Sequence, residues 1–296
     1  MRRALITSGG GAKGAFTVGA LKHLAKVGID TFDIVSGTST GSLIASMAAI
    51  GEIDLLEQVY STVTNQDILL QQNIVQNLTN NKPFIFDTEP LRELIVKHIT
   101  DSVFQKIVQS NTTLCLSGIS LQNGALTVFS TKDLPPTADY NTIKINTKKE
   151  LVDAMVASSS QAGFLPPVNI NGEQFVDGGN REVIPTRIAV NLLPDEIFVI
   201  SNNPNRIFPT TENYTNILKV LMRAIAIFIQ EVRENDMAVL RLYAAKSGAK
   251  VTIIEPEEDL DPEYPTGLRF NQLAMTNWIK KGELRAKKIL DQGGIV

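Results

Sequence analysis

The sequence lacks several features that would point to particular classes of protein. Its 296 residues contain one cysteine, Cys115, so no disulfide can form within the chain. No run of about 18 apolar residues occurs, and we expect no transmembrane helix. The net charge of −3 provides no basic excess for nucleic acid. We therefore expect a cytoplasmic protein that has no nucleic-acid partner and contacts membranes at most peripherally.

The residues that are present are typical of a globular α/β protein, with 43% hydrophobic and 20% charged side chains. The first fifty residues alternate between strand-like and helix-like patterns: a strand over 3–8, a helix over 12–27, a strand over 32–37 and a helix over 39–50. This order predicts a parallel sheet covered by helices. Cys115 lies in a further buried strand, where a packed and inert thiol is expected.

The remainder of the chain continues the α/β pattern without an internal repeat or a long linker. Further elements are expected as strands over 112–121, 125–131, 173–179, 196–201 and 251–256, and as helices over 148–160, 213–248 and 268–292. The first two of these strands are joined at Gln122–Gly124, where Asn-Gly favours a tight hairpin turn. We predict a single domain over 1–296, with a central, mostly parallel sheet of about six strands.

Two segments allow more than one interpretation. Residues 60–90 are rich in Asn and Gln and are expected to form helices and loops over the sheet, or a lid. The long helix carries an apolar stripe of Leu218, Leu221, Ile225, Phe228 and Val232, which Asn235 and Asp236 interrupt. We favour packing of this helix on the sheet with a local polar contact. The alternative is a surface that faces lipid or a partner.

The glycine-rich loop after the first strand allows several functions. Gly9, Gly11 and Gly14 fit the G-x-G-x-x-G fingerprint of dinucleotide-binding folds. That fingerprint expects an acid at the end of the second strand, whereas Asp33 stands at its start. A P-loop is also disfavoured, because Lys13 is not followed by Ser or Thr.

A second glycine motif, Gly37-Thr38-Ser39-Thr40-Gly41, lies between a β-branched strand and a helix. A G-x-S-x-G sequence in this context predicts a nucleophile elbow, with Ser39 lifted on a sharp turn. Gly37 and Gly41 would remove Cβ clashes from that turn. The alternative is an ordinary Gly/Ser/Thr loop that caps the helix.

The base for such a serine is expected to be a carboxylate. The only histidines, His23 and His98, lie before the serine and in an amphipathic helix of the middle region, so neither occupies the late position expected of a base. Asp177 ends a short strand and is followed by Gly178 and Gly179. Because ligands bind at the carboxyl ends of parallel strands, we expect Asp177 to meet Ser39 there. The alternative is a common Asp-Gly turn.

A nucleophile beside the first glycine loop suggests that the loop is an oxyanion hole. Backbone N–H groups of Gly9, Gly10 and Gly11 would point at the developing alkoxide, where such donors contribute ~3 kcal/mol each. Lys13 would add positive charge or brace the loop. A glycine turn without a catalytic role is the alternative.

Together these motifs resemble those of the patatin-like phospholipases, which carry a glycine-rich loop with a basic residue, a G-x-S-x-G elbow and a D-G-G or D-G-A aspartate. The matching segments are "GGGAKG" from Gly9, "GTSTG" from Gly37, "DGG" from Asp177 and "ASSSQAGFLPPV" over 157–168, and all lie within the first 180 residues. Residues 181–296 carry no such motif and are assigned to the same domain. The chain departs from the family at Ser8, where Asp is frequent, and at Lys13, where Arg is commoner.

The resemblance implies a three-layer α/β fold and a Ser39–Asp177 dyad. It implies a serine acyl hydrolase of the phospholipase A type, which cleaves lipid esters at a membrane or micelle surface through an acyl-enzyme. Gly14 and the glycines that flank Ser39 and Asp177 would support the site. Backbone amides would hold the oxyanion, so no metal or cofactor is required. The alternatives are an esterase, thioesterase or acyltransferase with the same dyad, a nucleotide-binding protein that uses Gly9–Gly14, and a patatin-like binding module without activity.

Overall fold

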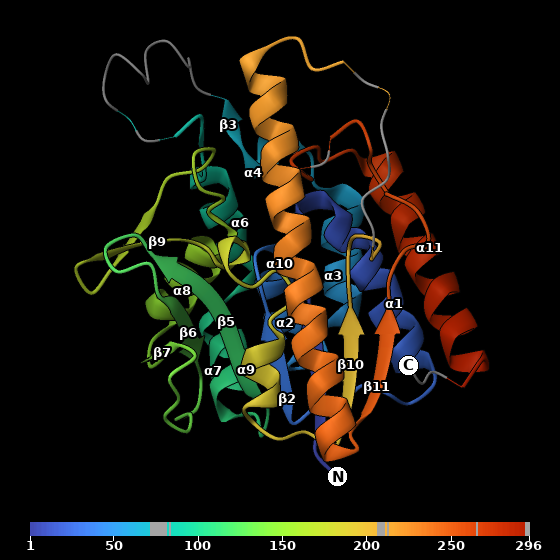
Figure 1. The fold of residues 1–296 in the computed structure, drawn as a ribbon. Coiled ribbons are helices and arrows are strands. Elements are labelled where there is room, and N and C mark those ends of the chain that lie inside the picture. The colour runs from blue at the N-terminus through green and yellow to red at the C-terminus, as the bar shows by residue number, and fades with distance from the viewer. Residues whose placement is uncertain (72–81, 83, 206–210, 212, 265, 294–296) are drawn as a thin grey trace.

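The computed structural model of the protein describes residues 1–71, 82, 84–205, 211, 213–264 and 266–293. A nine-stranded sheet lies at the centre (Figure 1). Five of its strands run parallel in the order β11 (Lys250–Ile254), β10 (Glu196–Ile200), β1 (Arg3–Thr7), β2 (Ile34–Gly37) and β5 (Thr113–Ser120). The predicted α/β class with a mostly parallel sheet is confirmed, although the sheet has more strands than expected.

Helices cover both faces of the sheet and produce three layers (Figure 1). One face packs against α1 (Gly14–Lys26), α2 (Thr40–Ala48), α8 (Lys148–Ser159) and α11 (Gln272–Asp291). The other packs against α9 (Thr186–Val190) and α10 (Ile217–Ser247). Alternation along β1 explains the division, because Leu5 joins the first core while Ala4 and Ile6 join the second.

At the β7 edge of the sheet, the strands run in the opposite direction to the five parallel strands. β6 (Leu126–Ser130) pairs antiparallel with β5, and β7 (Asn141–Lys144) runs parallel to β6. The predicted hairpin between β5 and β6 is present, but its loop spans residues 121–125 and is longer than the tight turn expected at Asn-Gly. β7 lacks a strong apolar pattern, since three of its four residues are exposed, which explains why the sequence did not reveal it.

The strand that ends at Asp177 is antiparallel, and here the sequence-based prediction of a parallel strand end was wrong. β9 (Glu173–Asp177) pairs antiparallel with β5 through Gly118, Ile119 and Ser120. A hairpin turn at Asn171-Gly172, where both residues have positive φ, joins it to β8 (Val168–Ile170). Because β6 takes one edge of β5, β9 must share the other edge with β2.

Smaller elements complete the chain between β2 and β5. These are α3 (Ile53–Thr62), α4 (Asn65–Ile68), the short strands β3 (Leu70–Gln71) and β4 (Phe86–Asp87), α6 (Glu89–His98) and α7 (Asp101–Gln109). The 3-10 turns η1 (Gly11–Lys13) and η2 (Gly178–Asn180) follow β1 and β9. The predicted lid over 60–90 falls partly on residues 72–81 and 83, which lie outside the described residues. Among the described helices, none has the length and apolar character needed to span a bilayer.

The long helix α10 packs on the sheet along its second half only. Met237 and Leu240 are buried against the sheet, and the backbone N–H of Ile184 donates to the Asp236 carboxylate at 2.9 Å. The first turns extend beyond the neighbouring elements (Figure 1), and Leu221 and Phe228 are exposed in the first half of the helix. Packing along the entire predicted stripe is therefore contradicted, while the local polar contact at Asp236 is present. The Leu218 side chain lies outside the described residues.

Candidate active site

Ser39 lies on a sharp turn between β2 and α2. Its φ of 57° and ψ of −130° are unfavourable for a residue with a side chain, so the surrounding contacts must hold the turn. A Cβ on Gly37 would lie 2.3 Å from the Gly41 carbonyl oxygen, and a Cβ on Gly41 would lie 2.3 Å from that of Thr7. The Ser39 N–H donates to the Ser158 hydroxyl at 3.0 Å. These contacts fix a strained turn that leaves Ser39 partly accessible.

Asp177 meets Ser39 because β2 and β9 run toward each other along the same edge of β5. Gly37, the last residue of β2, pairs with Leu116, while Asp177 pairs with Gly118. The two strand ends are thus two residues of β5 apart, roughly 7 Å along the strand. Ser39 and Asp177 line the same cavity, and the Ser39 side chain is close enough to lower the pKa of the Asp177 carboxyl group.

The Asp177 carboxyl is buried, and its environment changes its acidity. Burial disfavours the charged form and raises the pKa of Asp177 to about 6, against the lowering effects of the Ser39 side chain and the Gly179 N–H. The Gly179 N–H donates to Asp177 Oδ1 at 2.7 Å. Gly178 also permits close packing, since a Cβ there would lie 2.0 Å from the Ser117 hydroxyl oxygen. The arrangement provides a carboxylate of raised basicity beside a hydroxyl.

The glycine loop lies beside Ser39, but it offers fewer free donors than predicted. The Gly9 N–H donates to the Val183 carbonyl oxygen at 3.1 Å, so the prediction of Gly9 as an oxyanion donor was wrong. Gly9 instead allows close approach, since a Cβ there would lie 3.2 Å from the Ser39 Cβ. Within the described part of the chain, the N–H groups of Gly10 and Gly11 have no hydrogen-bond partner, and both residues line the same cavity as Ser39.

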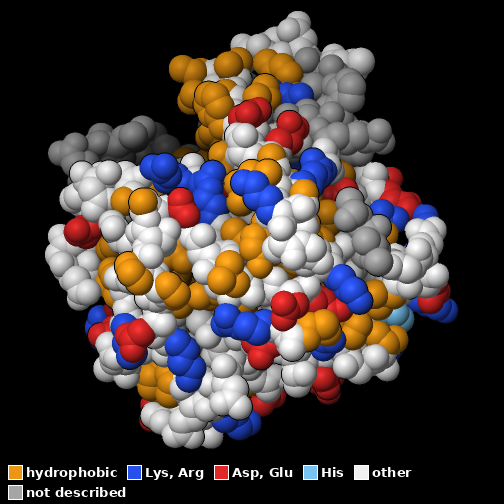
Figure 2. Space-filling model, turned by 60° about the horizontal axis from the view of Figure 1, so that its bottom comes forward, with side chains coloured by type: hydrophobic (Ala, Val, Ile, Leu, Met, Phe, Trp, Pro, Cys, Tyr) orange, Lys and Arg blue, Asp and Glu red, His pale blue; other side chains and the backbone are white. Residues whose placement is uncertain are grey.

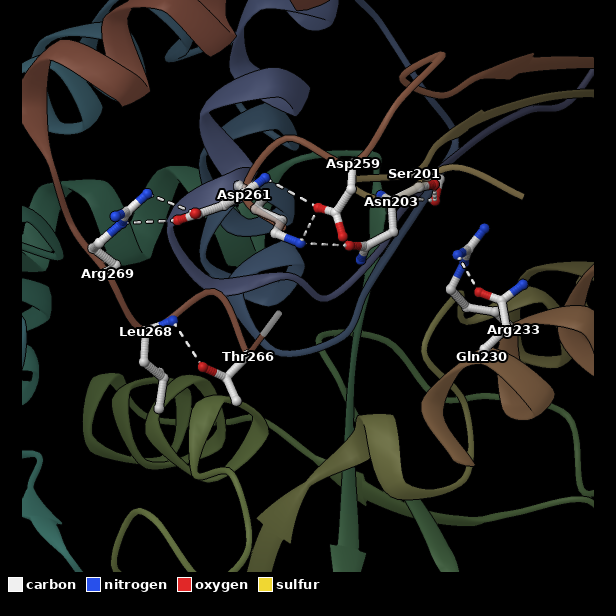
Figure 3. Close-up of polar contacts among 10 residues, drawn as sticks. Ser201, Asn203, Gln230, Arg233, Asp259, Asp261, Thr266, Leu268 and Arg269 are labelled. Carbon is white, nitrogen blue, oxygen red and sulfur yellow. Dashed lines mark hydrogen bonds and ion pairs between the residues drawn. The ribbon is translucent and has the colours of Figure 1, made fainter. Parts of the chain in front are cut away.

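The buried Lys13 side chain supports the glycine loop through polar contacts with Asp259 and Asn203. Its side chain is 1% exposed, and its Nζ lies 2.7 Å from Asp259 Oδ1 and 3.1 Å from Asn203 Oδ1. Asp259 and Asn203 converge from different segments in Figure 3, and the Asp259 carboxylate also accepts the Asp261 N–H at 3.0 Å. Of the two roles considered for Lys13, this geometry favours bracing over a charge in the site.

The chain around Gly267 packs directly on the glycine loop. The Ala12 N–H donates to the Gly267 carbonyl oxygen at 2.8 Å, and a Cβ on Gly11 would lie 2.3 Å from that oxygen. Asp261 and Arg269 pair through two contacts of 2.6 and 3.0 Å within the same segment (Figure 3). The C-terminal part of the chain therefore fixes the conformation of the loop.

Further supports were not apparent from the sequence. Asn202 donates from its side chain to the Ser8 carbonyl oxygen at 2.9 Å and accepts from the Thr17 hydroxyl at 2.7 Å. The Thr38 hydroxyl donates to the Glu182 carbonyl oxygen at 2.9 Å. Asn202 follows a predicted strand directly, which is a sequence signal for a site residue that we did not use. The contact at Glu182 depends on tertiary structure and left no signal.

An apolar cavity of about 240 Å³ opens beside Ser39 and Asp177. The middle region, which was predicted to form helices and loops over the sheet or a lid, contributes much of the lining through α3, α4 and α6. The apolar lining residues are Leu43, Met47, Leu55, Leu56, Val59, Val63, Ile68, Leu69, Leu91, Leu94, Ile95, Ile99, Met155, Ala162, Leu165, Val183, Ile225, Ile229, Leu268 and Phe270. Such a lining suits a hydrocarbon chain, because polar groups transferred into it would lose hydrogen bonds to water.

The other residues singled out in the sequence lie partly at this cavity and partly outside it. Gly14 begins α1, and a Cβ there would lie 2.8 Å from the Tyr60 hydroxyl oxygen. His98, at the end of α6, lines the cavity, whereas His23 lies on α1 outside it. In the part of the chain that the structure describes, no hydrogen bond connects either histidine with Ser39 or Asp177. Cys115 is buried in β5 as expected, and burial raises the pKa of its thiol to about 12.

A family model for patatin-like phospholipases matches residues 5–190, a range that contains the glycine loop, the Ser39 turn and Asp177. The chain belongs to the patatin-like phospholipase family. This family member has relatives in Escherichia coli. A cUMP-AMP-activated phospholipase is 45% identical over 64 residues, which cover 20% of each chain. A cGAMP-activated phospholipase is 26% identical over 193 residues, which cover 60% of this chain and 51% of the relative.

These matches are partial in length. The matched segments span about a fifth and about half of the two phospholipases. Among solved structures, VipD from Legionella pneumophila is similar with a TM-score of 0.43 and 14% identity, over 98% of this chain and 67% of VipD. The family assignment of this patatin-like chain therefore rests on the match over residues 5–190.

Proposed function

We propose that this patatin-like protein hydrolyses carboxylic ester bonds of phospholipids or related lipids, with Ser39 as nucleophile and Asp177 as base. The observation that carries the proposal is the meeting of a serine on a strained turn with a buried carboxyl group at an apolar cavity. Family membership supports the same reaction class. The extent of the apolar lining favours a long acyl chain over a small ester.

In the proposed first half-reaction, Asp177 accepts the Ser39 proton while Ser39 Oγ forms a bond to the ester carbonyl carbon. The N–H groups of Gly10 and Gly11 would donate to the resulting oxyanion, with that of Thr40 as a third candidate by analogy with other nucleophile elbows. The tetrahedral intermediate then expels the lysolipid alkoxide, which takes the proton from Asp177. An acyl-Ser39 ester remains.

The second half-reaction returns the enzyme to its starting state. Asp177 accepts a proton from water as the water oxygen bonds to the acyl carbon. Collapse of the second tetrahedral intermediate breaks the bond to Ser39 Oγ, which regains the proton, and a fatty acid leaves. A carboxyl group with a pKa of about 6 is a stronger base than an ordinary aspartate and is still ionised at neutral pH.

A nucleotide-binding role of the glycine loop receives less support. The lysine that could approach a phosphate is buried and paired with Asp259, and the cavity beside the loop is lined mainly by hydrocarbon. A long acyl chain fits such surroundings better than a triphosphate or a pyrophosphate does.

The decisive experiment combines covalent labelling with lipid hydrolysis. A fluorophosphonate carrying a long alkyl chain should label the parent protein once, at Ser39, and should not label Ser39→Ala. Mass spectrometry of phosphatidylcholine and phosphatidylglycerol vesicles should detect fatty acid and lysolipid only with the parent. Ser120→Ala is the matched control, because it removes a buried serine hydroxyl of β5 that does not line the cavity. Hydrolysis by Ser39→Ala at the parent rate would refute the proposal.

A further inference from the structure

The first half of α10 exposes a set of apolar side chains. The solvent-exposed face of a surface helix normally carries polar side chains. Ile217, Leu221 and Phe228 are 80%, 53% and 69% exposed. Spacings of four and seven residues place them on one face of the helix. Val220 and Ile227, at 49% and 46% exposed, extend this face. We refer to these five side chains as the α10 apolar face.

The space-filling view supports a local concentration of apolar side chains. Figure 2 shows hydrophobic side chains gathered on the part of the molecule that projects from the body, while the surface below is mixed with charged groups. A contiguous apolar surface of this kind usually marks an interaction site in a water-soluble protein.

The second half of the same helix has an ordinary polar surface, which makes the first half a local feature. Continuing the spacing from Phe228 along the solvent side gives Glu231, Asn235 and Lys246, all exposed. Leu242 is an isolated exposed apolar residue there. The concentration of exposed apolar side chains is therefore specific to the first half of α10 and is not a property of the whole helix.

Charge distinguishes between the partners that could cover this face. Residues 217–230 contain two basic residues, Lys219 and Arg223, and no acidic residue. A helix segment with apolar and basic side chains but no carboxylates suits a lipid surface that carries anionic headgroups. The chain as a whole has a net charge of −3, so this bias is specific to the segment.

The α10 apolar face is also adjacent to the cavity. Ile225 and Ile229 come from the same turns of α10 and line the cavity that contains Ser39 and Asp177. Exposed and cavity-lining side chains thus alternate around one helical segment. A lipid tail that leaves a bilayer beside this segment would reach the cavity along apolar side chains.

We propose that residues 217–229 of α10 dock the protein on an anionic lipid membrane, with the α10 apolar face inserted among the acyl chains and Lys219 and Arg223 near the headgroups. The choice of a membrane as partner rests on the proposed lipid hydrolase function. The geometry that supports docking is separate from the dyad, because none of the five side chains of the α10 apolar face lines the cavity.

Vesicle co-sedimentation in the Ser39→Ala background tests docking without turnover. Vesicles of phosphatidylcholine with 30% phosphatidylglycerol are compared with pure phosphatidylcholine. Leu221→Ser with Phe228→Ser should lower the partition coefficient at least tenfold on the anionic vesicles, because two exposed apolar side chains are lost. Leu242→Ser is the matched control on the polar half of the same helix, with 56% exposure against 53% for Leu221, and should change partitioning less than twofold.

Hydrolysis of a short, soluble p-nitrophenyl ester without vesicles separates the two proposals. In the protein that retains Ser39, the double variant Leu221→Ser/Phe228→Ser should hydrolyse this ester at the parent rate but should no longer hydrolyse phospholipids in vesicles. Equal sedimentation of the double variant and the parent would overturn the docking proposal, as would absence of parent binding to either vesicle. A parent dimer that the double variant converts to monomer would assign the face to a second copy instead. Hydrolysis of the soluble ester by Ser39→Ala at the parent rate would refute the proposed dyad. The sedimentation result would not affect that conclusion.

Discussion

Asp177 and Ser39 are brought together by two strands that end face to face on one edge of β5. β2 reaches Leu116 of β5 from one direction and β9 reaches Gly118 from the other. Ser39 and Asp177, at or just beyond these two ends, accordingly line the same cavity, and the Ser39 side chain lowers the pKa of the Asp177 carboxyl group. The proximity of the two strand ends follows from a mixture of parallel and antiparallel pairing, and a purely parallel sheet would not place them in this way.

The pH dependence of ester hydrolysis should report Asp177. The base must be ionised, so kcat/KM should fall about tenfold per pH unit below the pKa of about 6 and reach a plateau above it. The measurement is a pH–rate profile on a soluble p-nitrophenyl ester between pH 4.5 and 8. A profile that is flat across pH 5–7 would contradict a base with this pKa.

Asp177→Asn should abolish hydrolysis and stabilise the fold at neutral pH. The pKa of Asp177 is raised from 3.8 to about 6 on folding, so the parent loses stability as pH rises from 4 through 6. A shift of about two pKa units means that ionisation of Asp177 costs the parent ~3 kcal/mol of folding stability at pH 7. The uncharged Asn side chain does not carry this cost.

Thermal unfolding of both proteins as a function of pH provides the measurement. The melting temperature of Asp177→Asn should exceed that of the parent by several degrees at pH 7. The gap should narrow toward pH 4, where the parent carboxyl group is neutral. An Asn variant that is less stable than the parent at pH 7 would show that other contacts dominate.

Asp259→Asn should weaken the site by loosening the glycine loop. The buried Lys13 ammonium would lose its charged partner at 2.7 Å and retain Asn203. We expect kcat to fall about tenfold or more with a smaller change in KM, because the loop donors act mainly on the transition state. Glu258→Gln is the control, since it removes a neighbouring carboxylate that pairs with the exposed Lys281. Equal kcat values for the two variants would refute a bracing role of Asp259.

Gly11→Ala should reduce hydrolysis strongly because the added Cβ would meet the Gly267 carbonyl oxygen at 2.3 Å. Its φ of +57° adds strain of its own. Gly51→Ala separates the two causes, because Gly51 has a φ of +73° but no atom within 4 Å of an added Cβ. We expect Gly51→Ala to lower stability by about 1 kcal/mol and to keep the ester hydrolysis rate. If both variants keep that rate, the loop conformation is not critical.

His23→Ala and His98→Ala should each keep most of the activity on a soluble ester. Neither histidine is connected with Ser39 or Asp177 among the described residues, although His98 lines the cavity. His98→Ala can alter KM for a long-chain substrate through its place in the lining. A loss of roughly 10⁴-fold in kcat for either variant would restore a histidine mechanism.

The sequence by itself determined the local elements and the candidate chemistry. Short-range patterns identified β1, β2, β10, β11 and the helices between them, because apolar periodicity depends only on neighbouring residues. Glycines around Ser39 indicated a turn at which a side chain would clash, and the structure has close backbone contacts at Gly37 and Gly41, while the closest contact at Gly178 is the Ser117 side chain.

Only the tertiary structure decided how these elements meet. The antiparallel direction of β9 depends on its pairing with β5, and the Asn171-Gly172 signal for that hairpin was present but not used. The loss of Gly9 as a donor depends on the Val183 carbonyl oxygen, 174 positions later in the chain. The exposed first half of α10 has the same apolar pattern as a buried helix, because periodicity shows that a face is apolar and cannot show what covers it.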